Sequence, residues 1–296
     1  MSSHSTSTPN TTWRDKLYGY FALARVSNSP TVFSNTLAGA ALAGVTSPNS
    51  TVIMIAIAMI AFYTAGMYLN DILDYEIDLK ERADRPLTTG LISRNAAMTV
   101  TLLLFGFGIA ILLSNGARSF IGGLVLIGLI VLYDAWHKKN PLSPVIMGAN
   151  RFMVYIVAFV TFQVTLTGEV LLAAGLLWVY IIALTFIAKS ETRADFTRYW
   201  PVAVLLAPAV VFGVQLLDDP VWLLLVVAFV GWVLFSVSFI YRKTGRSIGG
   251  AIVRLIAGVS LFDAIVMATV GATTGVILAL AAFILTLFFQ QYIKGT

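Results

Sequence analysis

The chain has 296 residues, of which 58% are hydrophobic and only 11% are charged. A typical soluble domain carries about 25% charged residues, and one soluble core of this size cannot bury so much apolar surface. The chain has no cysteine, which excludes disulfides, thiolate metal sites and a cysteine nucleophile. It carries a net charge of +5 but no nucleic-acid-binding motif. The composition therefore predicts an all-α polytopic membrane protein that uses lipid as solvent.

The chain begins with a stretch rich in Ser, Thr and Pro, residues 1–12, which is typical of disorder. It has neither the basic start nor the apolar stretch of a secretory signal. We expect residues 1–19 to form a disordered cytoplasmic tail, and residues 20–296 to form a single transmembrane domain.

Apolar segments long enough to cross about 30 Å of hydrocarbon recur along the whole sequence. The last two can form two spans, or one span and one re-entrant piece, so the predicted number of transmembrane helices is nine or ten. The segments are 24–46, 51–70, 95–114, 118–136, 145–166, 169–188, 200–217, 220–240, 251–271 and 275–293.

Basic residues gather in every second loop, on the side of the N-terminal tail. The opposite side carries only Arg118, beside three acidic residues. This is the positive-inside pattern, and it predicts a cytoplasmic N-terminus in an integral membrane protein, which in a bacterium lies in the cell or inner membrane. Because all the long polar loops share that side, an active site built from polar groups is expected to face the cytoplasm.

A first acidic stretch, NDILDYEIDLKERADRPLTTG, covers residues 70–90 at the end of the second predicted span. Its first part has no Pro or Gly, so the helix is expected to continue out of the membrane. At 3.6 residues per turn, Asp71, Asp74 and Asp78 fall on one face, with Asn70 one turn below Asp74. Three carboxylates on one face need a divalent ion, a basic side chain or both. Oxygen donors without Cys or His suit Mg²⁺, whose other ligands are usually phosphate oxygens.

A solvated cytoplasmic loop is the simpler interpretation of the same stretch. Charged loops are common, and Arg82 and Arg85 can balance the carboxylates. Asn70 and Asp71 lie at the membrane boundary and share a helical face with Asp74 and Asp78. This arrangement favours a binding face over such a loop.

A second acidic stretch, SETRADFTRYW, follows the sixth predicted span. Glu191 and Asp195 are four residues apart and share a helical face, with Arg193 between them. A charge cluster at a helix end is the alternative. Four helices separate the two stretches, so both are expected on the same side, where two Mg²⁺-binding faces can clamp a diphosphate. If that diphosphate is allylic, its departure leaves a carbocation, which an apolar and aromatic cavity shelters from water.

Residues 70–78, followed by Arg85-Pro86-Leu87 and Gly90, resemble the first aspartate-rich motif of the UbiA superfamily of intramembrane aromatic prenyltransferases. The helix pattern is similar to that of the family from about residue 20 onward. The resemblance implies a ring of helices around a central cavity, capped by two acidic motifs. It also implies Mg²⁺-dependent transfer of a prenyl group from an isoprenyl diphosphate to a small aromatic or lipid acceptor in the membrane.

The resemblance assigns roles to two groups of side chains. The metal ligands it implies are Asn70, Asp71, Asp74, Asp78, Glu191 and Asp195. The catalytic or diphosphate-binding groups it implies are Asp71, Asp74, Asp78, Arg82, Arg85, Tyr133 and Lys138. Beside these, we expect Arg151 and Arg193 to assist at the diphosphate. The second motif departs from the family pattern, because Glu191 replaces an Asp and no Gly-Asp pair follows. This departure leaves the second metal and the choice of substrate open.

Two charged residues fall inside predicted spans, where an ionisable group marks a functional site by default. Arg151 is expected to face the interior, where it reaches the diphosphate or instead pairs with Asp134 or another acid. Asp263 is expected either to contact the acceptor or act as a base, or to be a neutral, hydrogen-bonded packing residue. His137 is a candidate base, but because it neighbours Lys138 and Lys139 at a helix end we expect it to be a plain interfacial residue.

Two other functions fit the same residues. A non-catalytic carrier of isoprenoid or aromatic lipids can share this fold, although a transporter should show helices broken near the midplane, and Pro208 is the only deep break. A membrane terpene cyclase would share the ionisation step and need no external acceptor.

Overall fold

The structure is a computed structural model that describes the chain except for residues 1–11, 139, 190–197, 243 and 294–296. All regular structure in the described part is helical, which confirms the predicted fold class. The helices are α1 (Trp13–Leu23), η1 (Val26–Asn28), α2 (Ser29–Leu42), α3 (Ser50–Leu73), α4 (Tyr75–Glu81), α5 (Arg94–Ser114), α6 (Ala117–Trp136), α7 (Ser143–Phe162), α8 (Gly168–Lys189), α9 (Trp200–Gly213), η2 (Val214–Leu216), α10 (Pro220–Tyr241), α11 (Ile248–Thr269) and α12 (Thr273–Tyr292).

Eight helices of the described chain are long and apolar enough to cross a membrane, namely α3, α5, α6, α7, α8, α10, α11 and α12. Each of the ten predicted spans contains a helix, but two of these helices are shorter. The segment Trp200–Leu216 is one, and α2, with 14 residues, is the other. The first predicted span is shortened because its start forms the 3₁₀ turn η1, and Pro30 then lies in the first turn of α2.

The start of the chain departs from the predicted disordered tail, because α1 already begins at Trp13. The side chain of Thr12 accepts a hydrogen bond from the backbone N–H of Asp15. The Asp15 carboxylate in turn accepts one from the Thr12 backbone N–H at 2.8 Å. This capping box satisfies N–H groups that a helix start otherwise leaves unpaired.

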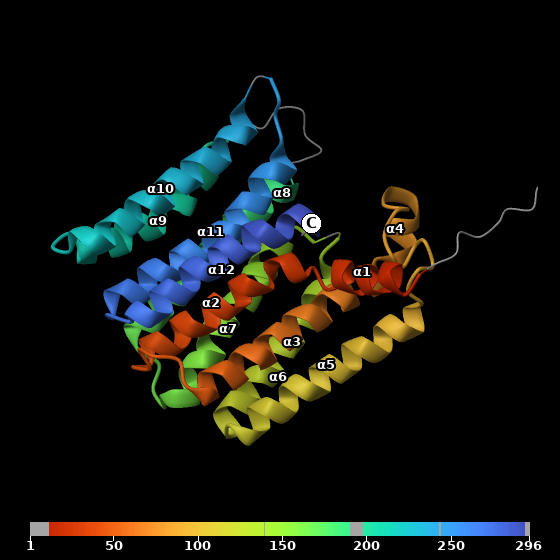
Figure 1. The fold of residues 1–296 in the computed structure, drawn as a ribbon, viewed down its shortest axis with the longest axis horizontal. Helices are drawn as coiled ribbons and strands as arrows, with labels where there is room; N and C mark the ends of the chain where they lie inside the picture. The colour runs from red at the N-terminus through yellow and green to blue at the C-terminus, as the bar shows by residue number, and fades with distance from the viewer. Residues whose placement is uncertain (1–11, 139, 190–197, 243, 294–296) are drawn as a thin grey trace, which may run out of the picture.

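The junction of α3 and α4 also differs from the sequence prediction of one continuous helix. Asp74 is the C-cap of α3 and the N-cap of α4, and α4 stands away from the line of α3 (Figure 1). The backbone bonds continue through the junction: the Asp74 N–H donates to the Asn70 carbonyl, and the Asp78 N–H to the Asp74 carbonyl, both at 2.9 Å. The helix therefore changes direction without losing the register of its aspartates.

The helices lie side by side, with α5 near one edge and α9 and α10 at the other (Figure 1). The most deeply buried helix is α11, in which every residue from Ala257 to Ala268 is buried. It packs against α2, α8, α10 and α12, and fills the interior of that half of the bundle. A second apolar cluster lies in the other half, where α3, α5, α6 and α7 meet around Phe62. Open space for a ligand is found in that second half.

Gly39 lets α2 pack closely against α7. A Cβ atom at this position would lie 2.6 Å from the carbonyl oxygen of Tyr155 and 2.9 Å from the Cβ of Ala158. Helix backbone cannot move aside as the end of a flexible side chain can. The contact therefore fixes the position of α2, which carries polar side chains into the bundle.

We expect Gly39→Ala to destabilise the protein by about 1–3 kcal/mol, because it overpacks this contact. Gly106→Ala in α5 is the matched control, since a Cβ there meets nothing within 4 Å. Thermal unfolding in detergent, followed by the loss of the monodisperse chromatographic peak, compares the two variants. Equal unfolding temperatures would contradict the close approach of α2 and α7.

Candidate functional site

The aspartates of the first acidic stretch are buried where α3 meets α4. Asp71, Asp74 and Asp78 are only 5%, 6% and 3% exposed. The Arg85 Nη1 atom lies 2.8 Å from Asp71 Oδ1 and 2.6 Å from Asp78 Oδ2, so one guanidinium nitrogen sits between two carboxylates. Arg25 adds a second cation, 3.1 Å from Asp71 Oδ1. The predicted need for a positive charge on this face is confirmed, and in this structure basic side chains supply it.

Asp74 is paired with the end of α6. His137 Nε2 and Lys138 Nζ each lie 3.3 Å from Asp74 Oδ2, so His137 is not the plain interfacial residue that we expected. Burial alone would raise the pKa of Asp74, but the hydrogen bonds and charges of His137 and Lys138 outweigh it and lower that pKa. Burial would likewise lower the pKa of His137, and its contact with Asp74 reverses this and raises it.

Arg25 belongs to the acidic face, although the sequence analysis assigned it no role there. Its backbone lies in the left-handed region (φ 44°), which is rare for a residue other than glycine and costs on the order of 1–3 kcal/mol. The Tyr63 hydroxyl donates to its carbonyl oxygen at 3.3 Å, and its Nη1 lies 3.3 Å from Met67 Sδ. A sequence shows a charge at this position but not the turn that aims it at Asp71.

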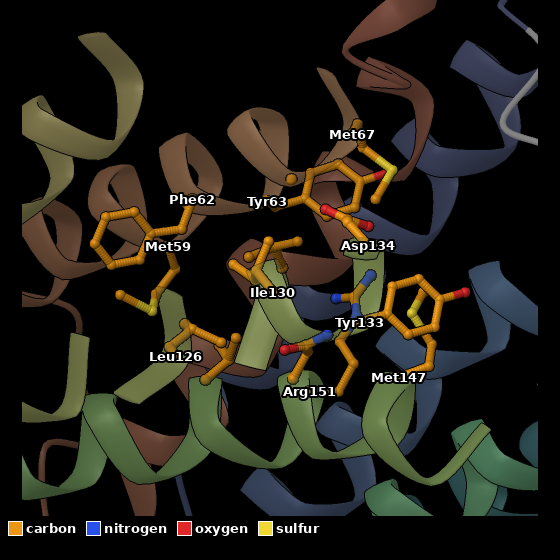
Figure 2. Close-up of a pocket in the computed structure, with 14 residues that line it drawn as sticks. Met59, Phe62, Tyr63, Met67, Leu126, Ile130, Tyr133, Asp134, Met147 and Arg151 are labelled. Carbon is orange, nitrogen blue, oxygen red and sulfur yellow. The ribbon is translucent and has the colours of Figure 1, made fainter. Parts of the chain in front are cut away.

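A cavity adjoins the acidic face and is lined by residues of α2, α3, α6 and α7 (Figure 2). The empty space of this region, about 560 Å³, includes open solvent. Its two ends differ in character. Figure 2 shows Phe62, Met59 and Leu126 together at one end, and Tyr63, Tyr133, Asp134 and Arg151 toward the other. The remaining lining residues are Val32, Gly66, Met67, Ile130, Met147, Asn150 and Val154.

The polar end of the cavity is connected to the acidic face by side-chain contacts. Asp134 lines the cavity, and its Oδ1 accepts a hydrogen bond from Asn70 Nδ2 at 3.3 Å. Asn70 is the neighbour of Asp71 in the chain. Tyr133, which also lines the cavity, stacks on His137 with ring centroids 5.0 Å apart. The acidic face and the polar end of the cavity are therefore neighbouring parts of one region of the protein.

Arg151 reaches the cavity from α7, as the sequence predicted for a cation inside a span. Its Nη1 donates to Asn35 Oδ1 at 2.7 Å and its Nη2 to Thr31 Oγ1 at 3.0 Å, so its hydrogen bonds go to α2 rather than to Asp134. The guanidinium also lies over the ring of Tyr63, 5.6 Å from its centroid. Arg151 is thus held in a fixed direction at the polar end of the cavity.

Asp263 anchors this arrangement from the buried helix α11. Its carboxylate is fully buried and accepts hydrogen bonds from Ser34 Oγ at 2.5 Å, Tyr155 OH at 2.6 Å and Asn35 Nδ2 at 2.8 Å. Because the Asn35 amide turns its nitrogen to Asp263, its oxygen faces Arg151. The hydrogen-bonded packing residue was one of the two expectations for Asp263, and these contacts agree with it.

Most of the predicted site residues fall into two groups in the structure. Asn70, Asp71, Asp74, Asp78, Arg85 and Lys138 come together at the acidic face, and Tyr133 and Arg151 line the adjoining cavity. Arg82 ends α4 and is exposed, outside both groups, because the chain turns there. Glu191, Arg193 and Asp195 lie outside the described residues.

The acidic face suits a divalent cation in the chemistry of its donors. Within the described residues, no three Asp, Glu, His or Cys side chains are close enough to hold a metal ion together. Asp71 and Asp78 nevertheless already share one positive atom, Arg85 Nη1, which stands where a cation between them would lie. Carboxylate oxygens are the ligands that Mg²⁺ prefers, so the residues fit this ion if Arg85 moves aside.

A sequence model of the UbiA prenyltransferase family matches residues 32–252. The chain belongs to the UbiA prenyltransferase family. This confirms the resemblance that the first acidic stretch indicated, and the eight long apolar helices of the described chain agree with a protein embedded in a membrane. The motif region, residues 70–90, lies inside the matched segment.

Individual relatives match shorter parts of the chain. A digeranylgeranylglyceryl phosphate synthase from Methanoregula boonei is 32% identical over 125 residues, which cover 42% of this chain and 44% of the relative. A protoheme IX farnesyltransferase from Macrococcus caseolyticus is 32% identical over 84 residues, 27% of this chain and 28% of the relative. The matched region thus spans less than half of either relative's own length.

The fold is similar to that of solved structures. A UbiA homolog from Archaeoglobus fulgidus bound to GPP and Mg²⁺ aligns with a TM-score of 0.62, covering 86% of this chain and 99% of the homolog at 13% identity. At this level of identity the likeness establishes the shared fold of the UbiA family.

We expect Arg85→Ala to destabilise the protein by about 3 kcal/mol, because two buried carboxylates lose their shared cation. Added Mg²⁺ should then raise the unfolding temperature of this variant more than that of the parent protein, since the ion replaces the missing charge. Lys80→Ala, at an exposed cation on α4, is the matched control. Equal stabilisation of all three proteins by Mg²⁺ would show that Arg85 does not occupy a cation site.

We expect Asp263→Asn to destabilise the protein by about 1–3 kcal/mol. The amide side chain has one acceptor oxygen, whereas the donors from Ser34, Asn35 and Tyr155 now share the two oxygens of a carboxylate. Tyr155→Phe removes only one of these donors, so its loss should be smaller. Asp218→Asn, at an exposed carboxylate, is the control for the chemical change. If Asp263→Asn and Asp218→Asn unfold at the same temperature, the Asp263 carboxylate does not hold α2 in place.

Proposed function

We propose that this protein is a prenyltransferase that works at the acidic face and its adjoining cavity. It transfers a prenyl group, with the help of Mg²⁺, from an isoprenyl diphosphate to a small-molecule acceptor in the membrane. One observation carries the proposal: buried carboxylates paired with basic side chains adjoin a largely apolar cavity, to which the hydrogen bond from Asn70 to Asp134 connects them. A diphosphate with an isoprenyl tail has this same division into a charged head and an apolar chain.

The diphosphate head lies at the acidic face in this proposal. Arg25, Arg85 and Lys138 are available to it as cations once they release the carboxylates that they now contact. Hydrogen bonds and positive charge aimed at the departing oxygen stabilise the charge that builds up there. When held by Asp71 and Asp78, with Asn70 and Asp74 beside them, Mg²⁺ would neutralise further charge on the leaving diphosphate.

Residues of the second acidic stretch complete the proposed site. Glu191 and Asp195 are proposed as further metal ligands, and Arg193 as a further diphosphate contact, on the strength of their spacing. Arg82 is proposed as a diphosphate contact only through its place in the motif, because its side chain is exposed.

The isoprenyl tail occupies the cavity, with its far end among Met59, Phe62 and Leu126. When the bond between the first carbon and the diphosphate oxygen breaks, both electrons leave with the diphosphate and an allylic cation remains. We assign stabilisation of this cation to the aromatic rings of Tyr63 and Tyr133, which line the polar end of the cavity. The acceptor then attacks that carbon, and the apolar walls exclude competing water.

The acceptor is the least constrained part of the proposal. The two relatives are named for different prenylated groups, a glyceryl phosphate and a protoheme. The aromatic acceptor that the sequence resemblance implied remains a proposal beside these. Any acceptor must bring a nucleophilic atom to the polar end of the cavity, near Tyr133 and Arg151.

We propose that the site faces the cytoplasm. Arg25, Arg85 and Lys138 all belong to the basic side of the chain, which the positive-inside pattern assigns to that compartment. In the same topology the N-terminal tail is cytoplasmic and residues 20–296 form one transmembrane domain.

Diphosphate release by the full chain in lipid nanodiscs tests the proposed chemistry. We expect release from allylic diphosphates only with Mg²⁺, and a loss of at least roughly a hundredfold in the Asp71→Ala/Asp74→Ala double variant, because it removes electrostatic groups at the departing diphosphate. Asp218→Ala, at an exposed carboxylate, is the control.

The same assay separates the rival functions. Folded protein that binds isoprenyl lipid but releases no diphosphate from any chain length would contradict the proposal and favour a carrier. Release that yields only cyclised hydrocarbon, with no dependence on an added acceptor, would favour a terpene cyclase.

A further inference from the structure

A strongly basic stretch connects α10 to α11, two helices that pack against each other and are joined by a turn (Figure 1). No acidic residue occurs in the sequence between Asp219 and Asp263. The same stretch carries four cations, Arg242, Lys243, Arg246 and Arg254. Neither Arg242 nor Arg254 lines the cavity or forms an ion pair with a described carboxylate. The proposed chemistry therefore makes no use of these two charges.

Both arginines converge on one aromatic ring. The guanidinium carbon of Arg242 lies 4.0 Å from the centroid of the Phe239 ring, and that of Arg254 lies 4.2 Å from the same centroid. A ring face attracts each cation, but the ring has no net charge and leaves the repulsion between the cations in place. An anion at this surface would be attracted by both guanidinium groups.

The turn and the start of α11 bring the two cations together. Gly245 has a φ of 71°, and the Ser247 N–H donates to the Phe239 carbonyl at 3.0 Å, so the chain folds back on the end of α10. Arg254 lies in the second turn of α11, and its Nη1 donates to the Gly250 carbonyl at 2.7 Å. Because Gly250 is nearer the helix start, this bond directs the charge from inside the span toward the membrane surface.

Aromatic side chains continue from the two arginines toward the middle of the span. Phe235 is 47% exposed, and its ring meets that of Phe239 edge-on with centroids 5.2 Å apart. Trp232 packs against Phe235 and against Phe283 of α12, at centroid distances of 5.9 Å and 4.8 Å. The indole N–H of Trp232 donates to the Arg254 carbonyl at 2.8 Å, so its polar atom is satisfied. A basic surface is thus followed by an apolar one, as in the headgroup and chains of a lipid.

We propose that Arg242 and Arg254 bind the phosphate of an anionic phospholipid, from the leaflet on the basic side of the protein. Its acyl chain lies along Phe235 and Trp232. Charge complementarity selects the headgroup, because basic clusters at the ends of transmembrane helices attract anionic lipids, and the N-terminus of α11 adds positive potential. The lipid is a constituent of the bilayer rather than a substrate, since the catalytic cavity is lined by α2, α3, α6 and α7.

Native mass spectrometry of the full chain tests the inference without requiring turnover. The protein is equilibrated in mild detergent with equal amounts of phosphatidylglycerol and phosphatidylcholine that carry the same acyl chains, and the retained lipid is identified by its mass. The test variant is Arg242→Gln/Arg254→Gln. Arg14→Gln is the matched control, because Arg14 is an exposed arginine that also lies over a ring, 5.5 Å from the centroid of Trp13.

We expect the parent protein and the control to retain phosphatidylglycerol over phosphatidylcholine roughly tenfold, and the double variant to lose most of this preference, because the cations that attract the headgroup are gone. Phosphatidylglycerol should also raise the unfolding temperature of the parent more than phosphatidylcholine does, and the double variant should lose this difference. If the double variant does not fold, Arg242→Gln, at an exposed position, is measured alone and should keep a roughly threefold preference.

Three results would overturn the inference. The first is equal retention of the two lipids by the parent protein. The second is an equal loss of preference in Arg14→Gln and the double variant, which would mean a diffuse attraction to the basic side without a site at Phe239. The third is a different occupant: displacement of the bound lipid by geranyl diphosphate would assign the surface to a substrate, and its loss in a dimer would assign the surface to a second copy of the chain.

Discussion

Two buried carboxylates, those of Asp71 and Asp78, share a single guanidinium nitrogen of Arg85 at the end of α3. Buried acidic groups so close together are stable only with positive charge between them. The turn after α4 brings Arg85 back to the helix junction, and the left-handed backbone of Arg25 directs a second cation to Asp71. Asp74 likewise forms ion pairs with His137 and Lys138, which follow the end of α6. Charge neutralisation at this one place thus ties α3, α4 and α6 together.

The same balance of charge explains how the site can be both stable and reactive. A face built only of carboxylates would repel itself, whereas here basic side chains pair with them. In the proposed function a divalent ion takes the place of at least one of these side chains. Behind the face, the chain of contacts from Asp263 through Asn35 to Arg151 fixes the polar end of the cavity from the deeply buried α11. The reactive end of a substrate would therefore meet side chains that are already oriented, which is how a preorganised site lowers a barrier.

The sequence was sufficient for the parts that follow from periodicity and composition. Runs of apolar residues predicted the helices, and 3.6-residue spacing put Asp71, Asp74 and Asp78 on one buried face. The break at Asp74 was not predictable, because no Pro or Gly marks it and the backbone bonds run through it. The role of Arg25 depends on a left-handed turn, and that of His137 on a contact between helices far apart in sequence. Neither leaves a local signal. Asp263 could be recognised as unusual, but its donors come from α2 and α7, which only the packed fold brings together.

The central claim is that the acidic face holds the diphosphate and the cavity holds the tail. An experimental structure of the protein in lipid, with Mg²⁺ and a non-cleavable isoprenyl thiolodiphosphate, tests it most directly. The account predicts that the diphosphate lies beside Asp71 and Asp78, with Arg85 displaced from its position between them. It also predicts that the tail runs past Tyr63 toward Phe62 and Leu126. Density for the diphosphate at any other surface, or a tail that lies outside the cavity while Arg85 still bridges the two carboxylates, would contradict it.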